Sequence, residues 1–322
     1  MRWSIAKSSR FVLIALLLAA LGRAASPSPV RARRGMVVSV DERASRAGVA
    51  MLKQGGNAVD AAVATALALA VTHPAAGNLG GGGFLLIRFQ DGRSTFIDFR
   101  ERAPAAGSRD MYLDAAGTVI PEASTIGPLA SGVPGTVAGL EYASRKYGRL
   151  RWSRLVQPAV RLAREGFPVS YELARSLSHP TTVKRLSRFP ESRRIFLRNG
   201  RPYQPGERFR QRDLARTLER IRRRGAREFY HGWTARRFAA FMKESGGLIT
   251  LEDLASYRPL ERRPLTGTYR GYQIISAPPP SSGGTALLEM LNILEGAPLA
   301  EKGALSADAI HWTVEAMRRA FA

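Results

Sequence analysis

Cysteine is absent from this 322-residue chain. No disulfide can therefore form, and core packing alone must stabilise the fold. The absence also excludes a thiol nucleophile and any zinc site built on cysteine. Histidine is scarce, and its four residues lie far apart without an H-x-x-x-H pair: His73, His179, His231 and His311. We expect neither a metal centre nor a cofactor, and each histidine taken alone is typical of a structural or surface position.

Acidic residues are also few, because 26 Asp and Glu face 49 Lys and Arg, for a net charge of +23. Such a charge favours binding to nucleic acid only if the cations are grouped. Here they are mostly arginines spread along the chain. Between residues 211 and 225, Leu214, Leu218 and Ile221 fall on one helical face and the arginines lie elsewhere. This pattern is typical of a solvated helix surface, and we expect no nucleic-acid partner.

Long apolar runs are missing apart from Phe11–Leu21, which is too short to span a bilayer core of about 30 Å. Basic residues precede this run, and Gly22-Arg23-Ala24 follows it with small residues at the spacing of a cleavage site. The arrangement predicts a secretory signal peptide over residues 1–25 and no stable membrane span. A Pro- and Arg-rich stretch at 26–35 is predicted to be a flexible leader.

The next hundred residues predict helices and strands that alternate without a βαβ pattern. We expect a short strand at Met36–Val40, a helix that stops at Gly55, and an alanine-rich helix from Ala58 to Val71. Asp91-Gly92 between two apolar runs predicts a hairpin of strands 84–89 and 95–99. This order favours an α+β protein in which helices pack on a sheet.

Helical patterns dominate from Thr136 to about Ser245, and Thr250 to Asp253 has capping-box spacing before another short helix. Strands are expected at 264–269 and 272–276. The Pro-rich segment 277–284 is then predicted to be an ordered loop between a strand and a helix.

The last predicted helix begins after Ser306 and still runs at Ala322, with no glycine or polar cap. Its apolar residues follow helical spacing: Ile310, Val314, Met317 and Phe321. We therefore expect a chain that is truncated at its carboxyl end.

Local motifs alone identify no reaction. The glycine cluster Gly80–Gly83 matches neither phosphate-loop pattern and precedes a strand, so it favours a tight turn that admits a close backbone approach. No G-x-S-x-G sequence occurs, and the only S-x-x-K lies in the predicted signal peptide. Ser281 and Ser282 have no partner that the sequence identifies.

Five longer motifs, in order, resemble those of the γ-glutamyltransferases, most nearly the bacterial periplasmic branch. They are Lys53-Gln-Gly-Gly-Asn-Ala-Val-Asp60, Thr72-His-Pro-Ala-Ala-Gly-Asn-Leu-Gly-Gly-Gly-Gly-Phe84, Ile97-Asp-Phe-Arg-Glu-Arg-Ala-Pro104, Ala130-Ser-Gly-Val-Pro-Gly-Thr-Val-Ala-Gly139 and Ala277-Pro-Pro-Pro-Ser-Ser-Gly-Gly284. The similarity covers residues 36–322, which correspond to the family's large-subunit region.

The resemblance implies an N-terminal-nucleophile hydrolase fold, an αββα four-layer sandwich that is incomplete here because the small subunit is absent. In this family a precursor cleaves itself, and the new amino-terminal threonine of the small subunit attacks glutathione or another γ-glutamyl donor. Water, an amino acid or a dipeptide then accepts the γ-glutamyl group. This chain lacks the nucleophile, so we predict that it is inactive alone. The branch implies a periplasmic location.

One substrate contact is implied for this chain. Arg100, in the third motif, matches the family's arginine that holds the α-carboxylate of the donor, whereas Gly80–Gly83 and the Ser281-Ser282 loop are expected to shape the surrounding core. Two alternatives remain open. One is a secreted, non-catalytic remnant or γ-glutamyl-binding protein, and the other is a related amide hydrolase of the same fold.

Overall fold

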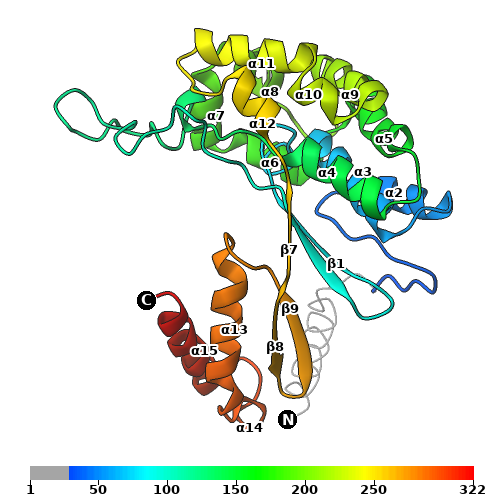
Figure 1. Ribbon diagram of the computed structural model, residues 1–322, viewed down its shortest axis with the longest axis vertical. Coiled ribbons are helices and arrows are strands. Elements are labelled where there is room, and N and C mark those ends of the chain that lie inside the picture. Colours follow the sequence, from blue (N-terminus) through cyan, green and yellow to red (C-terminus); the bar gives the residue numbers. More distant parts are fainter. Residues whose placement is uncertain (1–28) are drawn as a thin grey trace, which may run out of the picture. The chain divides into compact units, whose positions relative to one another are not determined.

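A computed structural model describes residues 29–322 of the chain (Figure 1). The predicted signal peptide lies outside this range, as does the first part of the leader. The chain divides into two units at residue 36, so residues 29–36 belong to the first unit and Val37–Ala322 form the second. Within the first unit, residues 29–36 are exposed and form no helix or strand. All elements below belong to the second unit.

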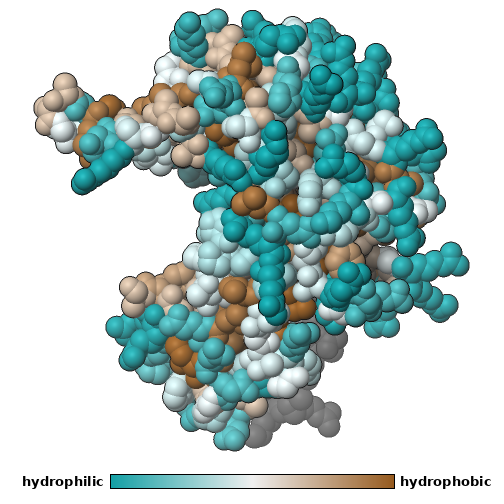
Figure 2. Space-filling model, in the orientation of Figure 1, coloured by the Kyte–Doolittle hydropathy of each residue, from teal (hydrophilic) through white to brown (hydrophobic). Residues whose placement is uncertain are grey.

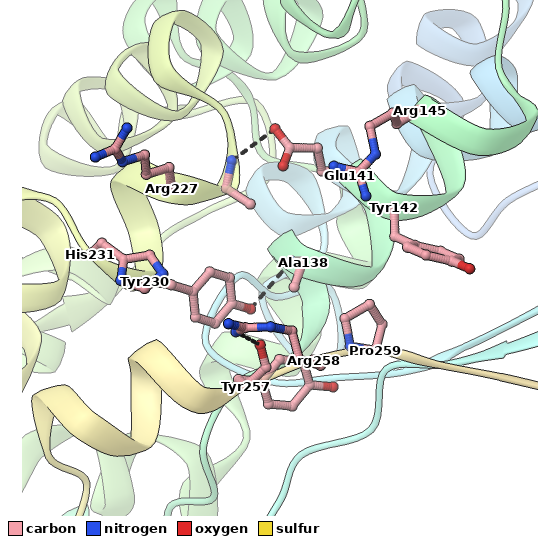
Figure 3. A pocket seen from close by; sticks show the side chains of 11 residues that line it. Ala138, Glu141, Tyr142, Arg145, Arg227, Tyr230, His231, Tyr257, Arg258 and Pro259 are labelled. Carbon is pink, nitrogen blue, oxygen red and sulfur yellow. Dashed lines mark hydrogen bonds between the residues drawn. The ribbon is translucent and has the colours of Figure 1, made fainter.

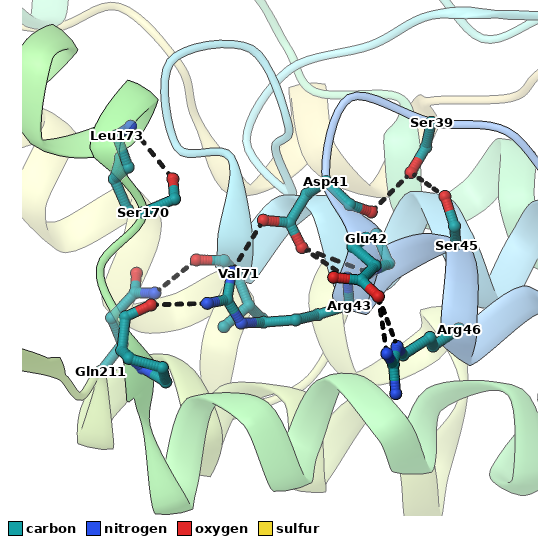
Figure 4. A network of polar contacts seen from close by, with 12 residues as sticks. Ser39, Asp41, Glu42, Arg43, Ser45, Arg46, Val71, Ser170, Leu173 and Gln211 are labelled. Atoms are coloured by element: carbon teal, nitrogen blue, oxygen red, sulfur yellow. Dashed lines mark hydrogen bonds and ion pairs between the residues drawn. The ribbon is translucent and has the colours of Figure 1, made fainter. Parts of the chain in front are cut away.

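The predicted strand at Met36–Val40 is wrong. These residues pair with no strand in the described part of the chain, and Val38 and Val40 are 81% and 75% exposed. β-branched residues favour an extended backbone, but a strand also needs a hydrogen-bonded neighbour. Ser39 instead bonds through its hydroxyl to the Asp41 carbonyl and to Ser45 Oγ, each at 2.8 Å (Figure 4).

Two helices follow and confirm the predicted pair: α2 (Glu42–Lys53) and α3 (Ala58–Thr72). Asp41 caps α2 and also pairs with Arg43 (Figure 4). The Arg43 guanidinium donates to the Pro168 carbonyl at 2.6 Å. Asn57 forms a complete capping box with Asp60 at the start of α3. Most residues of α3 are buried, which suits a helix that is rich in small apolar alanines on every side.

The main sheet is antiparallel, with strand order β1-β2-β7 (Figure 1). Strands β1 (Phe84–Arg88) and β2 (Ser94–Asp98) form the predicted hairpin, and β7 (Leu260–Arg262) pairs with the other edge of β2. Because β2 lies between two strands, it is the most buried of the three, and Asp98 at its end pairs with residues of both neighbours.

The region between β2 and β7 is mostly helical, as predicted. After a 3-10 turn (Pro128–Ala130) its helices are α4 (Thr136–Tyr147), α5 (Trp152–Glu165), α6 (Tyr171–Ser178), α7 (Pro180–Ser187), α8 (Pro190–Phe196), α9 (Arg212–Arg224), α10 (Ala226–Tyr230), α11 (Trp233–Glu244) and α12 (Leu251–Ser256). Two short antiparallel pairs interrupt them: β3 (Phe167–Pro168) with β6 (Arg208–Phe209), and β4 (Leu197–Arg198) with β5 (Arg201–Pro202). Leu218 and Ile221 of α9 are fully buried, whereas Arg222 and Arg223 pair with Glu219. The helix thus has the apolar face and solvated basic face that its sequence predicted.

Glu261 of β7 joins the sheet to α4. Its carboxylate accepts hydrogen bonds from Thr95 at 2.6 Å and from Tyr142 at 2.8 Å, and also from Lys146 and Tyr147. Burial opposes ionisation of Glu261, but these hydrogen bonds outweigh it and lower the pKa to about 2.

The carboxyl-terminal elements are β8 (Leu265–Tyr269), β9 (Tyr272–Ser276), α13 (Ser282–Glu295), α14 (Leu299–Lys302) and α15 (Ala307–Ala320). Strands β8 and β9 pair only with each other within the described residues, and a small separate cluster of Leu294, Ala297 and Ala316 joins α13 to α15. Helix α15 ends at Ala320, whereas the predicted helix still ran at Ala322. Its expected apolar stripe is 44–65% exposed, because the helix packs mainly through Ala316.

The surface carries hydrophilic residues over much of the face in Figure 2, with smaller hydrophobic areas between them. None of the helices in residues 29–322 has the length and apolarity that crossing a bilayer demands.

Candidate functional site

Arg100 lies two residues beyond the end of β2, after Phe99, and it is exposed. Within residues 29–322, no carboxylate lies within 4 Å of its guanidinium. Many other arginines of the chain are already paired with Asp or Glu. Among residues 29–322 the cationic fork of Arg100 therefore has no carboxylate partner, and it can bind an external carboxylate.

The backbone of Arg100, in contrast, is fixed on both sides. Its N–H donates to Asp98 Oδ1 at 3.0 Å, and its carbonyl accepts the Tyr257 hydroxyl at 2.9 Å. Both partners are buried, with 7% of Asp98 and 4% of Tyr257 exposed. The second oxygen of Asp98 accepts a hydrogen bond from Arg262 Nε of β7 at 2.9 Å.

The glycine turn before β1 lies against the same segment. A Cβ atom on Gly82 would lie 2.5 Å from the Phe99 carbonyl oxygen and 2.8 Å from Arg100 Cα. Gly83 exchanges two backbone hydrogen bonds with Phe99, at 3.1 and 3.3 Å. Only glycine permits this approach, as predicted for the cluster.

The fourth motif closes the other side of the segment. Gly81 accepts hydrogen bonds from the N–H groups of Gly135 and Thr136, at 2.7 and 3.1 Å. A Cβ atom on Gly135 would overlap both the Phe99 carbonyl and the Tyr257 hydroxyl. The structure thus brings together the second, third and fourth motifs around Arg100, although they are up to about sixty residues apart in the sequence.

The first and fifth motifs make contacts in other parts of the fold. The buried carboxylate of Asp60 accepts hydrogen bonds from the N–H groups of Arg149 and Leu150, so the first motif ties α3 to the end of α4. Gly284 lies against the Ala277 carbonyl, where a Cβ atom would approach to 1.9 Å. Ser281 and Ser282 stand at the start of α13, and the described contacts include no hydrogen bond from either to the Arg100 segment.

Tyr257 also lines a cavity of about 610 Å³ (Figure 3). There its ring stacks on Tyr230 with 5.8 Å between centroids, while the Tyr230 hydroxyl donates to the Pro134 carbonyl. Burial raises the pKa of both tyrosines above the ordinary value. Both hydroxyls therefore stay protonated, and Tyr257 remains a donor to Arg100.

The four histidines do not converge. His231 lines the cavity beside Tyr257, whereas His73 and His179 line a different cavity of about 630 Å³, and His311 is on α15. No group of three His, Asp or Glu side chains in the described range is arranged to hold a metal ion.

Three residues that support Arg100 were not predicted. Tyr257 and Arg262 lie about 160 residues beyond it and belong to no motif. Asp253 was predicted only as a helix cap, but its carboxylate also accepts the Ala105 N–H at 2.8 Å and so holds the segment that follows Arg100. Only the fold brings these partners together, and no local pattern marks them.

Comparison with known proteins agrees with this geometry. The family model described as gamma-glutamyltranspeptidase matches residues 44–322. The chain is 52% identical over 298 residues to the glutathione hydrolase proenzyme of Pseudomonas sp. strain A14, covering 92% of this chain and 52% of that protein. It is 51% identical over 295 residues to the glutathione hydrolase proenzyme of Escherichia coli K12, covering 91% and 50%. The chain thus spans about half the length of the curated relatives it matches.

A solved structure supports the fold directly. The crystal structure of Helicobacter pylori gamma-glutamyltranspeptidase superposes with a TM-score of 0.88 at 45% identity, covering 91% of this chain and 84% of that one. The predicted α+β fold of the N-terminal-nucleophile hydrolases is confirmed. The chain therefore belongs to the γ-glutamyltransferase, or γ-glutamyltranspeptidase, family.

Proposed function

We propose that this chain is the large-subunit part of a self-processing γ-glutamyltransferase. The full-length protein, made of this chain and a carboxyl-terminal part that becomes the small subunit, transfers the γ-glutamyl group of glutathione or a similar donor. The acceptor is water, an amino acid or a dipeptide. The similarity to glutathione hydrolase proenzymes supports this proposal.

The single observation that carries the proposal for this chain is the free guanidinium of Arg100 on a fixed backbone. A guanidinium presents two parallel N–H donors that match the two oxygens of a carboxylate. It stays charged at every physiological pH. Arg100 holds the α-carboxylate of the donor and so places the γ-amide for attack.

The attacking group comes from the small subunit. Its amino-terminal threonine supplies the hydroxyl nucleophile, and the α-amine of the same residue takes the proton. Backbone N–H groups stabilise the oxyanion, and the resulting γ-glutamyl ester is then resolved by the acceptor. The chain alone contributes the scaffold and Arg100, and is inactive. We further propose export to the periplasm, in line with the predicted signal peptide.

The assay is release of p-nitroaniline from γ-glutamyl-p-nitroanilide. The full-length protein is expected to turn over this donor, and the 322-residue chain is expected to release none above background. Turnover by the purified chain contradicts the assignment of the nucleophile to the small subunit. Tight binding of a γ-glutamyl ligand by a full-length protein that never cleaves it favours the alternative, a non-catalytic binding protein.

A further inference from the structure

Asp98 is a buried carboxylate that bonds to two groups at once. Only 7% of the residue is exposed, and its neighbours on the strand, Phe96 and Ile97, are buried apolar residues. A carboxylate in such a place is costly unless it is paired and hydrogen-bonded. Arg262 supplies the charge, and the Arg100 N–H supplies the second hydrogen bond.

The sheet itself does not need this side chain. Asp98 is the last residue of β2, and its position is set by register with Phe84 of β1 and Leu260 of β7. Its side chain instead turns forward and accepts the N–H of the residue two positions later. An aspartate used in this way fixes the direction in which the chain leaves a strand.

We propose that Asp98, held by Arg262, is a positioning residue for Arg100 in donor binding. This inference rests on the proposed role of Arg100. The N–H of Arg100 is held by Asp98, its carbonyl is held by Tyr257, and its Cα lies against Gly82. With both flanking peptide groups fixed, the Cα–Cβ bond has one direction, and the long side chain loses less freedom when it binds.

The ion pair gives Arg262 and Arg100 different tasks. Arg262 has its charge compensated by Asp98 at 2.9 Å, whereas Arg100 has no carboxylate partner among the described residues. The donor carboxylate is therefore attracted to Arg100 more than to Arg262. Asp98 thus fixes the direction of the Arg100 side chain. By neutralising Arg262, it also keeps Arg262 from binding the donor carboxylate.

The test compares variants of the full-length protein. Asp98→Ala removes both bonds and is expected to raise the KM for γ-glutamyl-p-nitroanilide about tenfold while kcat changes less than about twofold. Asp98→Asn keeps an oxygen that can accept the Arg100 N–H and is expected to raise KM only about threefold. Asp91→Ala is the matched control, because Asp91 accepts the Arg93 N–H and Nε in the same pattern at the exposed hairpin turn. Its KM should equal that of the unchanged protein.

A second measurement needs no activity. Hydrogen exchange of the Arg100 amide is expected to be slow in the unchanged chain and in Asp98→Asn, and at least tenfold faster in Asp98→Ala. Unchanged KM and unchanged exchange in a folded Asp98→Ala protein overturn the positioning role, and so does a loss of stability with KM unaltered. If Arg100→Lys has no effect on KM, the proposed role of Arg100 in donor binding is wrong. The exchange rate of the Arg100 amide in the Asp98 variants then still shows whether Asp98 fixes the Arg100 backbone.

Discussion

Replacement of Gly82 by alanine tests the packing around Arg100 most sharply. The added Cβ would lie 2.5 Å from the Phe99 oxygen, 2.7 Å from the Glu101 nitrogen and 2.8 Å from Arg100 Cα. All three are backbone atoms, so no side chain can rotate away. Because Cβ atoms essentially never approach closer than 3.0 Å, the segment must retreat by at least 0.5 Å.

The cost follows from what holds the segment in place. Overpacking of this kind costs about 1–3 kcal/mol. Retreat also stretches the hydrogen bonds from Tyr257 and to Asp98, each worth about 1 kcal/mol. We expect Gly82→Ala to lower the free energy of unfolding by about 2–3 kcal/mol, which corresponds to a fall in Tm of roughly 5 °C.

The matched control lies two residues away. A Cβ atom on Gly80 meets nothing within 4 Å, and its φ is outside the left-handed region. Gly80→Ala should therefore be neutral or slightly stabilising, by up to about 1 kcal/mol. Urea denaturation followed by circular dichroism measures both variants. Equal stabilities for the two, or a neutral Gly82→Ala, would refute the close approach of the turn to Arg100.

Two further predictions concern the supports of the site. Tyr257→Phe removes the hydrogen bond to the Arg100 carbonyl but keeps the stacked ring, so the free energy of unfolding should fall by about 1–1.5 kcal/mol. Tyr171→Phe, at an exposed tyrosine, is the control and should leave the free energy of unfolding unchanged in the same denaturation assay. Because the pKa of Glu261 is lowered from 4.5 to about 2, its stabilisation is complete above about pH 4.5 and is lost as pH falls toward 2. Glu261→Gln should therefore flatten the acid limb of the stability–pH curve, and an unchanged limb would contradict the role of this carboxylate.

Local features were predictable because their causes are local. The capping box predicted from Thr250 and Asp253 forms, and Asn57 and Asp60, which are also three residues apart, form another. The Asp91-Gly92 turn of the predicted hairpin likewise needs only its own residues, and Gly92 has a positive φ of 87°.

Features that depend on distant partners were not predictable. The sequence Met36–Val40 favours extended backbone, but whether it pairs depends on a neighbouring strand that the described chain does not provide. Tyr257 supports Arg100 across 157 residues of sequence, and Arg262 supports Asp98 across 164. Arg100 itself was singled out only by resemblance to a family, since one exposed arginine after a strand is locally like any other.

The central claim is that Arg100 binds the α-carboxylate of a γ-glutamyl donor. The most direct test compares γ-glutamyl-p-nitroanilide with 4-aminobutanoyl-p-nitroanilide, which lacks that carboxylate, in the full-length protein and in Arg100→Lys. The account predicts that the unchanged protein prefers the carboxylated donor in kcat/KM by roughly a hundredfold or more, as one charge-assisted bidentate pair allows. In Arg100→Lys this kcat/KM preference should fall at least tenfold, because KM rises for the carboxylated donor alone. An unchanged preference in Arg100→Lys would contradict the account.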